Sequence, residues 1–140
     1  MSTPRSITRL NDNLPPFLQL FKGRIASVDL ERQTVEMRFE VGTDLCHSVD
    51  IVQGGFITAM LDAAMSHALF ACDDTVVGVS SLEISTRYLE ATRAGRLRAT
   101  GRIVRLSYKT AFVEGELFDE AGKLLATTQS VAKVARKKAA

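Results

Sequence analysis

The 140-residue chain lacks tryptophan and holds only two cysteines and three prolines. The cysteines, Cys46 and Cys72, have neither metal-binding nor redox spacing, so we expect two reduced thiols, with a disulfide as the less favoured alternative. A formal net charge of +2 is too small to indicate a nucleic-acid partner. The chain also has no apolar segment before its first charges and no uniform apolar run of membrane-spanning length. These absences favour a cytoplasmic protein without a membrane partner.

Strand patterns dominate the chain, which is long enough to bury a core as one domain without disulfides. Alternation of apolar and polar residues is clearest in residues 34–41 and 96–103, and is typical of strands with one buried face. The predicted strands cover residues 24–30, 34–41, 76–90, 95–107, 110–118 and 123–134. Because the links between the last four are short, we expect these four to be antiparallel neighbours in a meander.

The ends of the chain and its loops are polar. We expect a loose tail over residues 1–13, a single domain over residues 14–134 and a solvated basic tail over residues 135–140. Two prolines precede four large apolar residues within residues 14–21, which predicts a short helix at the start of the domain. Residues 42–52 form a polar loop that leads into a pair of glycines.

An apolar helix is predicted over residues 53–71, and the rest of the chain is organised around it. Alanine, the best helix former, recurs throughout this segment, at residues 59, 63, 64, 68 and 71. The segment is apolar nearly all round, so we expect the helix to be wrapped by other elements. Together with the strands, it predicts an α+β fold in which an antiparallel sheet of about six strands curls round one long helix.

The predicted helix holds one carboxylate, Asp62, and a carboxylate is rarely buried unless it is paired or used. Ser66 lies one turn further on and points the same way. At the start of the helix, Gly54 and Gly55 leave N–H groups unhindered at the positive end of the helix dipole, where they can polarise a carbonyl oxygen. The helical rise separates Gly54 from Asp62 by about 12 Å, so one helix cannot bring both to one carbonyl. If the two groups act together, the spacing favours a dimer of antiparallel helices with two composite sites.

The segment Gln53-Gly54-Gly55, with Asp62 at the matching offset, resembles the central motif of the hotdog-fold acyl-CoA thioesterases of the PaaI (phenylacetate-degradation) type. That motif reads His-Gly-Gly, then six residues, then Asp or Glu. The resemblance covers about residues 15–134, although Gln53 replaces the usual histidine and Glu90-Ala91 replaces a frequent proline. It implies the hotdog fold and hydrolysis of an acyl-CoA to the free acid and coenzyme A, without a metal or other cofactor.

The resemblance also implies catalytic roles for four residues. Asp62 corresponds to the nucleophile or general base, and the backbone N–H of Gly54 to the group that polarises the thioester carbonyl. Ser66 corresponds to a hydroxyl that orients the attacking water in some relatives, and His47 stands where relatives carry Asn or Gln near the thioester or water. The alternatives are an Asp62 that hydrogen-bonds across a dimer interface, a Ser66 bonded to a carbonyl one turn back, and a His47 exposed on a loop.

Five further residues are candidates for substrate binding. Gln53 and Gly55 lie beside the polarising amide, and Ser81 matches a hydroxyl near the pocket of some family members. Arg105 and Lys109 flank a predicted turn near which relatives hold the nucleotide of coenzyme A. The alternatives are a tight turn for Gly55, an ordinary strand serine for Ser81, and solvated hairpin charges for Arg105 and Lys109.

The expected partners are an acyl-CoA substrate and a second copy of the chain. The resemblance implies a homodimer with composite active sites, and pairing of dimers into a homotetramer. His67 lies five residues after Asp62, about 140° away round the helix, so we interpret it as a packing or interface residue. The alternative function is a hotdog protein that binds acyl-CoA or another acyl group with little turnover.

Overall fold

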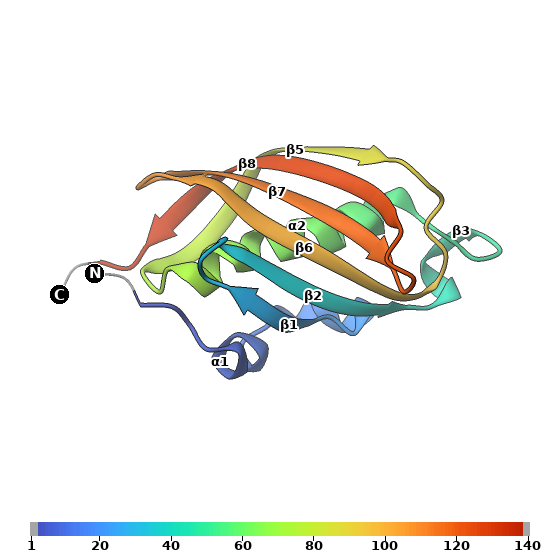
Figure 1. The fold of residues 1–140 in the computed structure, drawn as a ribbon, viewed down its shortest axis with the longest axis horizontal. Coiled ribbons are helices and arrows are strands. Elements are labelled where there is room, and N and C mark those ends of the chain that lie inside the picture. The colour runs from blue at the N-terminus through green and yellow to red at the C-terminus, as the bar shows by residue number, and fades with distance from the viewer. Residues whose placement is uncertain (1–2, 139–140) are drawn as a thin grey trace.

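The computed structural model describes residues 3–138 and contains one long helix and one large curved sheet (Figure 1). Helix α2 (Gly54–Cys72) lies inside a six-stranded antiparallel sheet with the order β1-β2-β6-β7-β8-β5. The strands are β1 (Arg24–Asp29), β2 (Thr34–Val41), β5 (Val76–Tyr88), β6 (Gly95–Leu106), β7 (Thr110–Asp119) and β8 (Leu124–Arg136). The predicted α+β architecture is therefore confirmed, with the helix and the six strands within a few residues of their expected bounds.

Small residues on the inner face of β6 let α2 approach the sheet closely. Leu97, Ala99, Gly101 and Ile103 are buried against the helix, while the residues between them face outward. A Cβ atom at Gly101 would lie 2.1 Å from the carbonyl oxygen of Ala64, a distance that backbone atoms cannot accept. The glycine at this position is thus a packing requirement of the helix–sheet contact.

The length and apolarity of α2 would also allow it to cross a membrane, which corrects the expectation that the chain holds no such run. The helix is instead a core element of this fold, because more than half of the stretch is buried inside the molecule. Met60, Leu61, Ala64 and Leu69 are all fully buried. The prediction of a wrapped helix is confirmed.

The predicted meander is correct for β6, β7 and β8 but wrong for β5. Strand β5 pairs with β8 along 11 residue pairs and forms the outer edge of the sheet, so it does not touch β6, which follows it in the chain. The link over residues 89–94 is short in sequence, yet six extended residues reach about 20 Å, which exceeds three inter-strand spacings of about 4.8 Å each. The short link between β5 and β6 therefore does not require these two strands to be neighbours in the sheet.

The expected N-terminal tail is partly folded, and the prediction of a loose segment is wrong for this part. Helix α1 (Ile7–Asp12) buries Leu10 and is capped by Ser6, whose side chain accepts a hydrogen bond from the Arg9 amide. The amide of Ile25 donates to Asn11 and the Asn11 side chain donates back to Ile25, which ties α1 to β1. Residues 1–2 of the expected tail lie outside the described residues.

Other short elements complete the fold. The predicted short helix is a 3₁₀ helix, η1 (Pro16–Phe21), and the polar loop contains η2 (Thr43–Leu45) and a small hairpin of β3 (Cys46–Ser48) and β4 (Ile51–Val52). Cys46 and Cys72 are both free thiols. The expected C-terminal tail begins later than predicted, because β8 continues to Arg136 and the Lys137 amide donates to the carbonyl of Thr75; residues 139–140 are not described.

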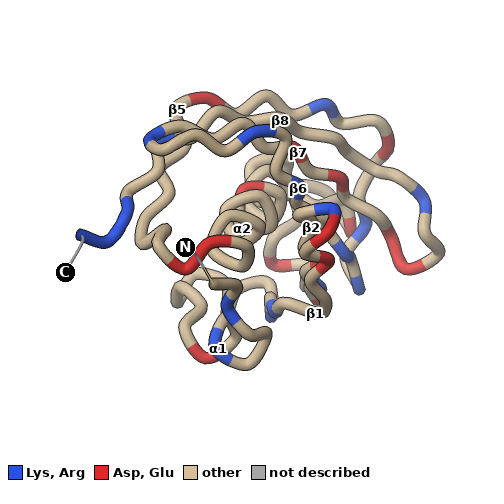
Figure 2. Tube along the Cα trace, turned by 60° about the vertical axis from the view of Figure 1, so that its left-hand side comes forward, with Lys and Arg blue, Asp and Glu red and all other residues tan. Residues whose placement is uncertain are grey.

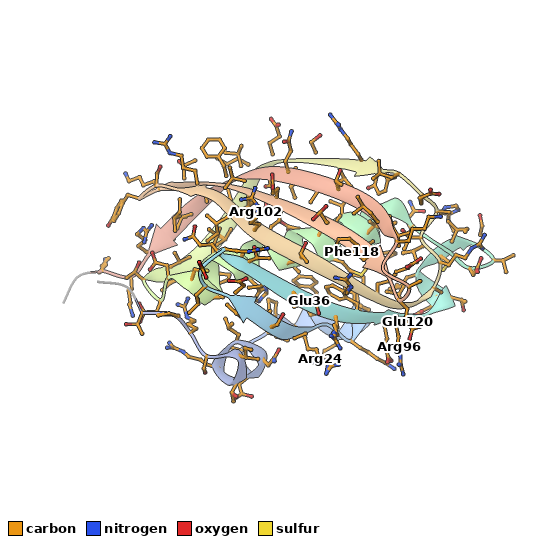
Figure 3. The ribbon with its side chains drawn as sticks, viewed as in Figure 1. Arg24, Glu36, Arg96, Arg102, Phe118 and Glu120 are labelled. Atoms are coloured by element: carbon orange, nitrogen blue, oxygen red, sulfur yellow. The ribbon has the colours of Figure 1, made fainter. Side chains whose placement is uncertain are left out.

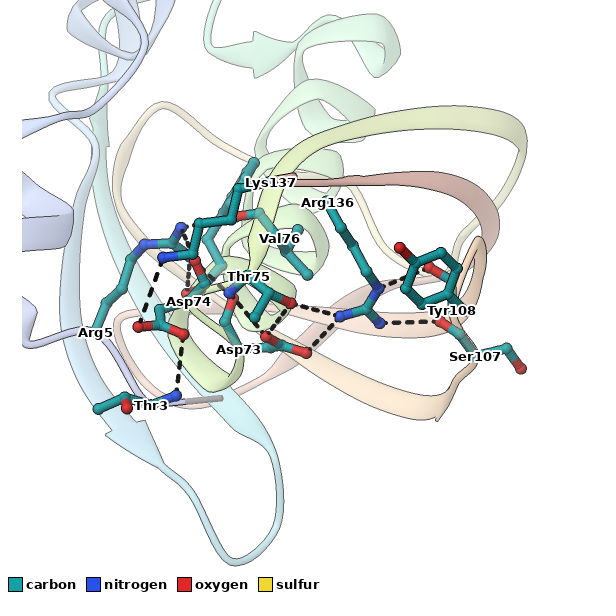
Figure 4. A network of polar contacts seen from close by, with 11 residues as sticks. Thr3, Arg5, Asp73, Asp74, Thr75, Val76, Ser107, Tyr108, Arg136 and Lys137 are labelled. Carbon is teal, nitrogen blue, oxygen red and sulfur yellow. Dashed lines mark hydrogen bonds and ion pairs between the residues drawn. The ribbon is translucent and has the colours of Figure 1, made fainter. Parts of the chain in front are cut away.

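Two arginines clamp the turn between α2 and β5 (Figure 4). Arg136 donates to Oδ2 of Asp73 over 2.8 Å and also to the carbonyls of Ser107 and Tyr108, so it joins this turn to the β6–β7 hairpin. Arg5 donates to four carbonyl oxygens around the same turn, those of Phe70, Asp73, Asp74 and Val76. Burial alone would raise the pKa of Asp73, but hydrogen bonds from Thr75 and Arg136 outweigh it and lower that pKa.

The outer face of the sheet carries paired charges. The arginines of β6 look strongly basic in the sequence, but Arg98 pairs with Glu36, Arg102 with Glu114, and Arg96 lies near Glu120 (Figure 3). The guanidinium of Arg98 also stacks on Phe118, 4.3 Å from the ring centre. Basic and acidic residues are interspersed over the molecule (Figure 2), so this face does not present a field of one sign.

Candidate functional site

Asp62 lies halfway along α2 on the side of the helix that faces the edge strand β5. Ser81 shares the inner face of β5, since it pairs with the buried Ala132 of β8, and its hydroxyl donates to Oδ1 of Asp62 over 2.8 Å. Within residues 3–138, the second carboxylate oxygen accepts no hydrogen bond. Asp62 is half-buried and Ser81 is exposed, so the carboxylate is oriented on one side and open on the other.

A chain of hydroxyl groups links the start of α2 to the end of β5. Tyr88 donates to the carbonyl of Gly54 over 2.9 Å, and its hydroxyl lies 2.8 Å from that of Thr58. Thr58 in turn donates to Thr86 over 3.0 Å. None of these three residues was predicted from the sequence, although Thr86 and Tyr88 stand at alternate positions of a predicted strand. Their shared inner face was the available signal.

The N-terminus of α2 has the local geometry expected of a group that polarises a carbonyl, because its first backbone N–H groups are free within residues 3–138. Gly54 is the first helical residue and Gln53 is the exposed N-cap residue, whose side chain makes no capping hydrogen bond. Within the described chain, no acceptor is present for the N–H groups of Gly54 and Gly55, while those of Phe56 and Ile57 both bond to the carbonyl of Gln53. A Cβ atom at Gly54 would lie 3.3 Å from the Tyr88 ring and hydroxyl, whereas Gly55 has open space around it. The two free donors therefore point out of the helix end.

His47 lies on the small hairpin that leads into α2. Its side chain is exposed, and Nδ1 is 2.8 Å from the hydroxyl of Ser48. The hairpin stands at the N-terminal end of α2, as Figure 1 shows, so His47 belongs to the Gly54 end of the chain and not to the middle of the helix where Asp62 lies. Both interpretations of His47, as a positioning residue and as an exposed loop histidine, fit this position.

The remaining candidates are spread along the molecule. Ser66 is half-buried one turn after Asp62. Both interpretations of its hydroxyl, as a group that orients water and as a partner of a carbonyl one turn back, stay predictions. Arg105 and Lys109 are exposed on the β6–β7 hairpin. This hairpin lies near the C-terminal end of α2, because Arg136 bonds to both Asp73 and Tyr108. Within one chain, these two cations are therefore far from Gly54.

His67 is packed inside the molecule, as predicted. It is 6% exposed, and its Nδ1 lies 2.7 Å from the carbonyl of Ala63. Burial lowers the pKa of its imidazole. In the part of the chain that is described, no three His, Cys, Asp or Glu side chains cluster closely enough to hold a metal ion.

The part of the chain that holds the candidate site matches the sequence pattern of a known protein family. Residues 50–126, which run from the turn before α2 through β5, β6 and β7 into β8, match the family described as the thioesterase superfamily. The chain belongs to the thioesterase superfamily. The match includes Asp62, Ser81 and both glycines at the helix start.

Solved structures extend this likeness beyond the family pattern. A phenylacetic acid degradation-related protein of Ralstonia eutropha JMP134, assigned as a thioesterase, is 28% identical with a TM-score of 0.84 and covers 93% of this chain and 100% of its own. A hypothetical thioesterase of Streptococcus pneumoniae TIGR4, solved with coenzyme A, has a TM-score of 0.75 at 14% identity and covers 87% of this chain and 93% of its own. The hotdog fold and the resemblance to phenylacetate-degradation thioesterases are confirmed.

A curated relative is longer than this chain. An uncharacterised protein of Schizosaccharomyces pombe is 33% identical over 87 residues, which make up 62% of this chain and 46% of the yeast protein. The chain thus matches about half the length of this relative. The similarity supports a domain shared by the two proteins, and since the relative is uncharacterised, it indicates no activity for this chain.

Proposed function

We propose that the protein is an acyl-CoA thioesterase, which hydrolyses an acyl-CoA to the free acid and coenzyme A in the cytoplasm, without a metal or other cofactor. The observation that carries the proposal is Asp62, a carboxylate on the central helix of a thioesterase-superfamily fold, held at one oxygen by Ser81 and open at the other. The coenzyme A in the pneumococcal structure supports a coenzyme A thioester as the substrate.

The proposed reaction uses a carboxylate opposite a pair of backbone amides. The N–H of Gly54 polarises the thioester carbonyl and stabilises the negative charge that develops on its oxygen. Asp62 either removes a proton from the attacking water or attacks the carbonyl carbon itself and is then released by water. In both routes the C–S bond breaks and the departing thiolate of coenzyme A takes up a proton. Ser66 and His47 position the water and the thioester.

The proposed site requires two subunits, because Gly54 and Asp62 are about 12 Å apart along one helix. The edge strand β5 offers the interface: its outer backbone groups pair with no strand in the described chain, and it is 13 residues long. Leu82 is 65% exposed and Tyr88 is 52% exposed along this edge. A long open edge with exposed apolar side chains is a ready template for pairing with another strand. Two copies joined here, antiparallel, bring the α2 helices side by side.

The antiparallel arrangement also brings the candidate substrate-binding residues of the two subunits together. The C-terminal end of one α2 meets the N-terminal end of the other, so Arg105 and Lys109 of one subunit approach the glycine end of its partner. There they can pair with the phosphates of coenzyme A, while Gln53 and Gly55 contact the thioester end. We include pairing of these dimers into a homotetramer as the larger assembly that the family resemblance implies.

The experiment that tests the proposal is release of free thiol from a panel of aliphatic and aromatic acyl-CoAs, measured beside equilibrium binding of the same compounds. We expect turnover of at least one class with saturation kinetics. If the native dimer binds acyl-CoA but releases no thiol from any member of the panel, the thioesterase proposal fails and the acyl-binding alternative replaces it.

A further inference from the structure

A groove lies beside α2, between the N-terminal segment and the C-terminal half of the helix, and Asp62 is not among its lining residues. Its volume is about 360 Å³, which is in the range of small-molecule sites. Its apolar lining comes from three parts of the chain: Leu10 and Pro15 of the N-terminal segment, Phe70 of α2, and Val76 and Val77 at the start of β5. Leu10 is buried and Phe70 is half-buried, so the groove has an apolar body.

His67 gives this groove one hydrogen-bond acceptor of defined chemistry. Its Nδ1 lies 2.7 Å from the carbonyl oxygen of Ala63, and because a carbonyl only accepts, Nδ1 carries the proton. Burial lowers the pKa of this imidazole, so the ring is neutral and Nε2 holds a free lone pair. Among residues 3–138, Nε2 has no hydrogen-bond partner, although the side chain is more than nine-tenths buried and lines the groove.

The mouth of the groove is cationic. Arg5 and Arg9 both line it, and no Asp or Glu is among its lining residues, whereas three other grooves of the described surface each contain at least one carboxylate. Arg5 is bound to four carbonyl oxygens, while the Arg9 guanidinium pairs with no carboxylate in residues 3–138. Burial lowers the pKa of Arg5 and the nearby charge of Arg9 lowers it further, while the charges of Asp74 and Asp73 raise it. Arg9 therefore lies close to Arg5, whose own charge is partly balanced by these two carboxylates.

We propose that this groove is a second small-molecule site, which binds a carboxylic acid bearing a hydroxyl group. Arg9 holds the carboxylate, the hydroxyl donates to Nε2 of His67, and the carbon chain packs against Leu10 and Phe70. An unsubstituted acid leaves Nε2 without a donor, so the site discriminates in favour of the hydroxy acid. The proposal goes beyond thioester hydrolysis and does not depend on it.

Calorimetric titration of the 140-residue protein with matched acids tests this proposal. The probes are 6-hydroxyhexanoate with hexanoate and 4-hydroxybutanoate with butanoate. We expect at least one hydroxy acid to bind about tenfold more tightly than its unsubstituted partner. Arg9→Gln should weaken that binding about tenfold or more, while Arg32→Gln, which removes an exposed arginine on the β1–β2 hairpin, should leave it unchanged.

The ¹⁵N resonance of His67 Nε2 in the native protein gives a second readout that needs no variant of a buried residue. It should shift on addition of the hydroxy acid and stay in place with the matched acid. Absence of binding by both hydroxy acids, equal affinity within each pair, or an unchanged affinity in Arg9→Gln would overturn the assignment. Because binding is measured without acyl-CoA, a loss of the thioesterase proposal leaves this test intact.

Discussion

The hydroxyl of Ser81 holds one oxygen of Asp62, and this contact joins a residue on the edge strand to a carboxylate on the central helix. The sequence predicted Asp62 from its isolation in an apolar helix, but it could not predict the Ser81 contact. That contact depends on the pairing of β5 with β8 and on a bulge between Ser81 and Glu83, which decides which side chains face inward. Thr86 and Tyr88 alternate along the predicted strand, so their shared face was visible in the sequence, but their contacts with Thr58 depend on how β5 packs against α2.

Ser81→Ala should lower the rate of thiol release by about tenfold, because a hydrogen bond to a charged group is lost near the reacting atoms. Steady-state kinetics should assign the change mainly to kcat. Ser80→Ala is the matched control, since Ser80 is the adjacent exposed serine and pairs with Lys133 on the opposite face of the strand. Equal rates in the two variants would show that the Ser81 hydroxyl has no part in the reaction.

His67 should make stability depend on pH. Burial lowers its folded-state pKa below the ordinary value of 6.5, so the unfolded chain binds more protons than the folded one at mildly acid pH. The stabilisation is complete above about pH 6.5 and is lost as the pH falls from there through the lower folded pKa. Urea unfolding between neutral pH and pH 5 should show this decline, and His67→Gln should reduce its slope. The same decline in His67→Gln and in the native protein would assign it to other groups.

Among the elements, α2 and the sheet strands were predictable, because the spacing of apolar residues and the composition of each segment indicate which of its faces are buried. The order of the strands was not predictable, since a six-residue link can either turn into a neighbour or cross two strands. Helix α1 was missed because it is only one and a half turns long and has a single buried residue, Leu10. Its position depends on Asn11 and on Arg5, which contact segments far away in the sequence.

Gly101→Ala should destabilise the fold by about 3 kcal/mol, because the added methyl group would overlap the backbone of α2 at Ala64. Neither the helix backbone nor the central strand can move aside without breaking other contacts. Gly55→Ala is the control: a Cβ atom there meets nothing within 4 Å. Thermal or urea unfolding of both variants measures the difference, and a native-like stability of Gly101→Ala would mean that α2 lies further from β6 than described.

At the scale of the whole molecule, the open edge of β5 and the separation of Gly54 from Asp62 point to the same assembly. A site built from two chains can be tested by mixing two defective chains. Gly54→Pro removes the N–H at the first helical position, where proline is tolerated, and the extended backbone of Gln53 (ψ 134°) suits a following proline. Asp62→Asn removes the carboxylate.

Coexpression of these two variants should give mixed dimers with one intact site and one doubly defective site. Since random pairing makes half of the dimers mixed, the expected activity is about one quarter of the native value. Each variant alone should be inactive. If the mixture is as inactive as its components, the carboxylate and the amide belong to one chain, and the composite site is wrong.

The central claim is that Asp62 performs the chemistry of thioester hydrolysis. The most direct measurement is kcat for thiol release by Asp62→Asn at a concentration of folded protein equal to that of the native enzyme. Glu83→Gln, which alters an exposed carboxylate further along β5, serves as the control. The account predicts a loss of about 100-fold or more in Asp62→Asn, unchanged thermal stability, and native turnover in Glu83→Gln. Native turnover in a folded Asp62→Asn protein would contradict it.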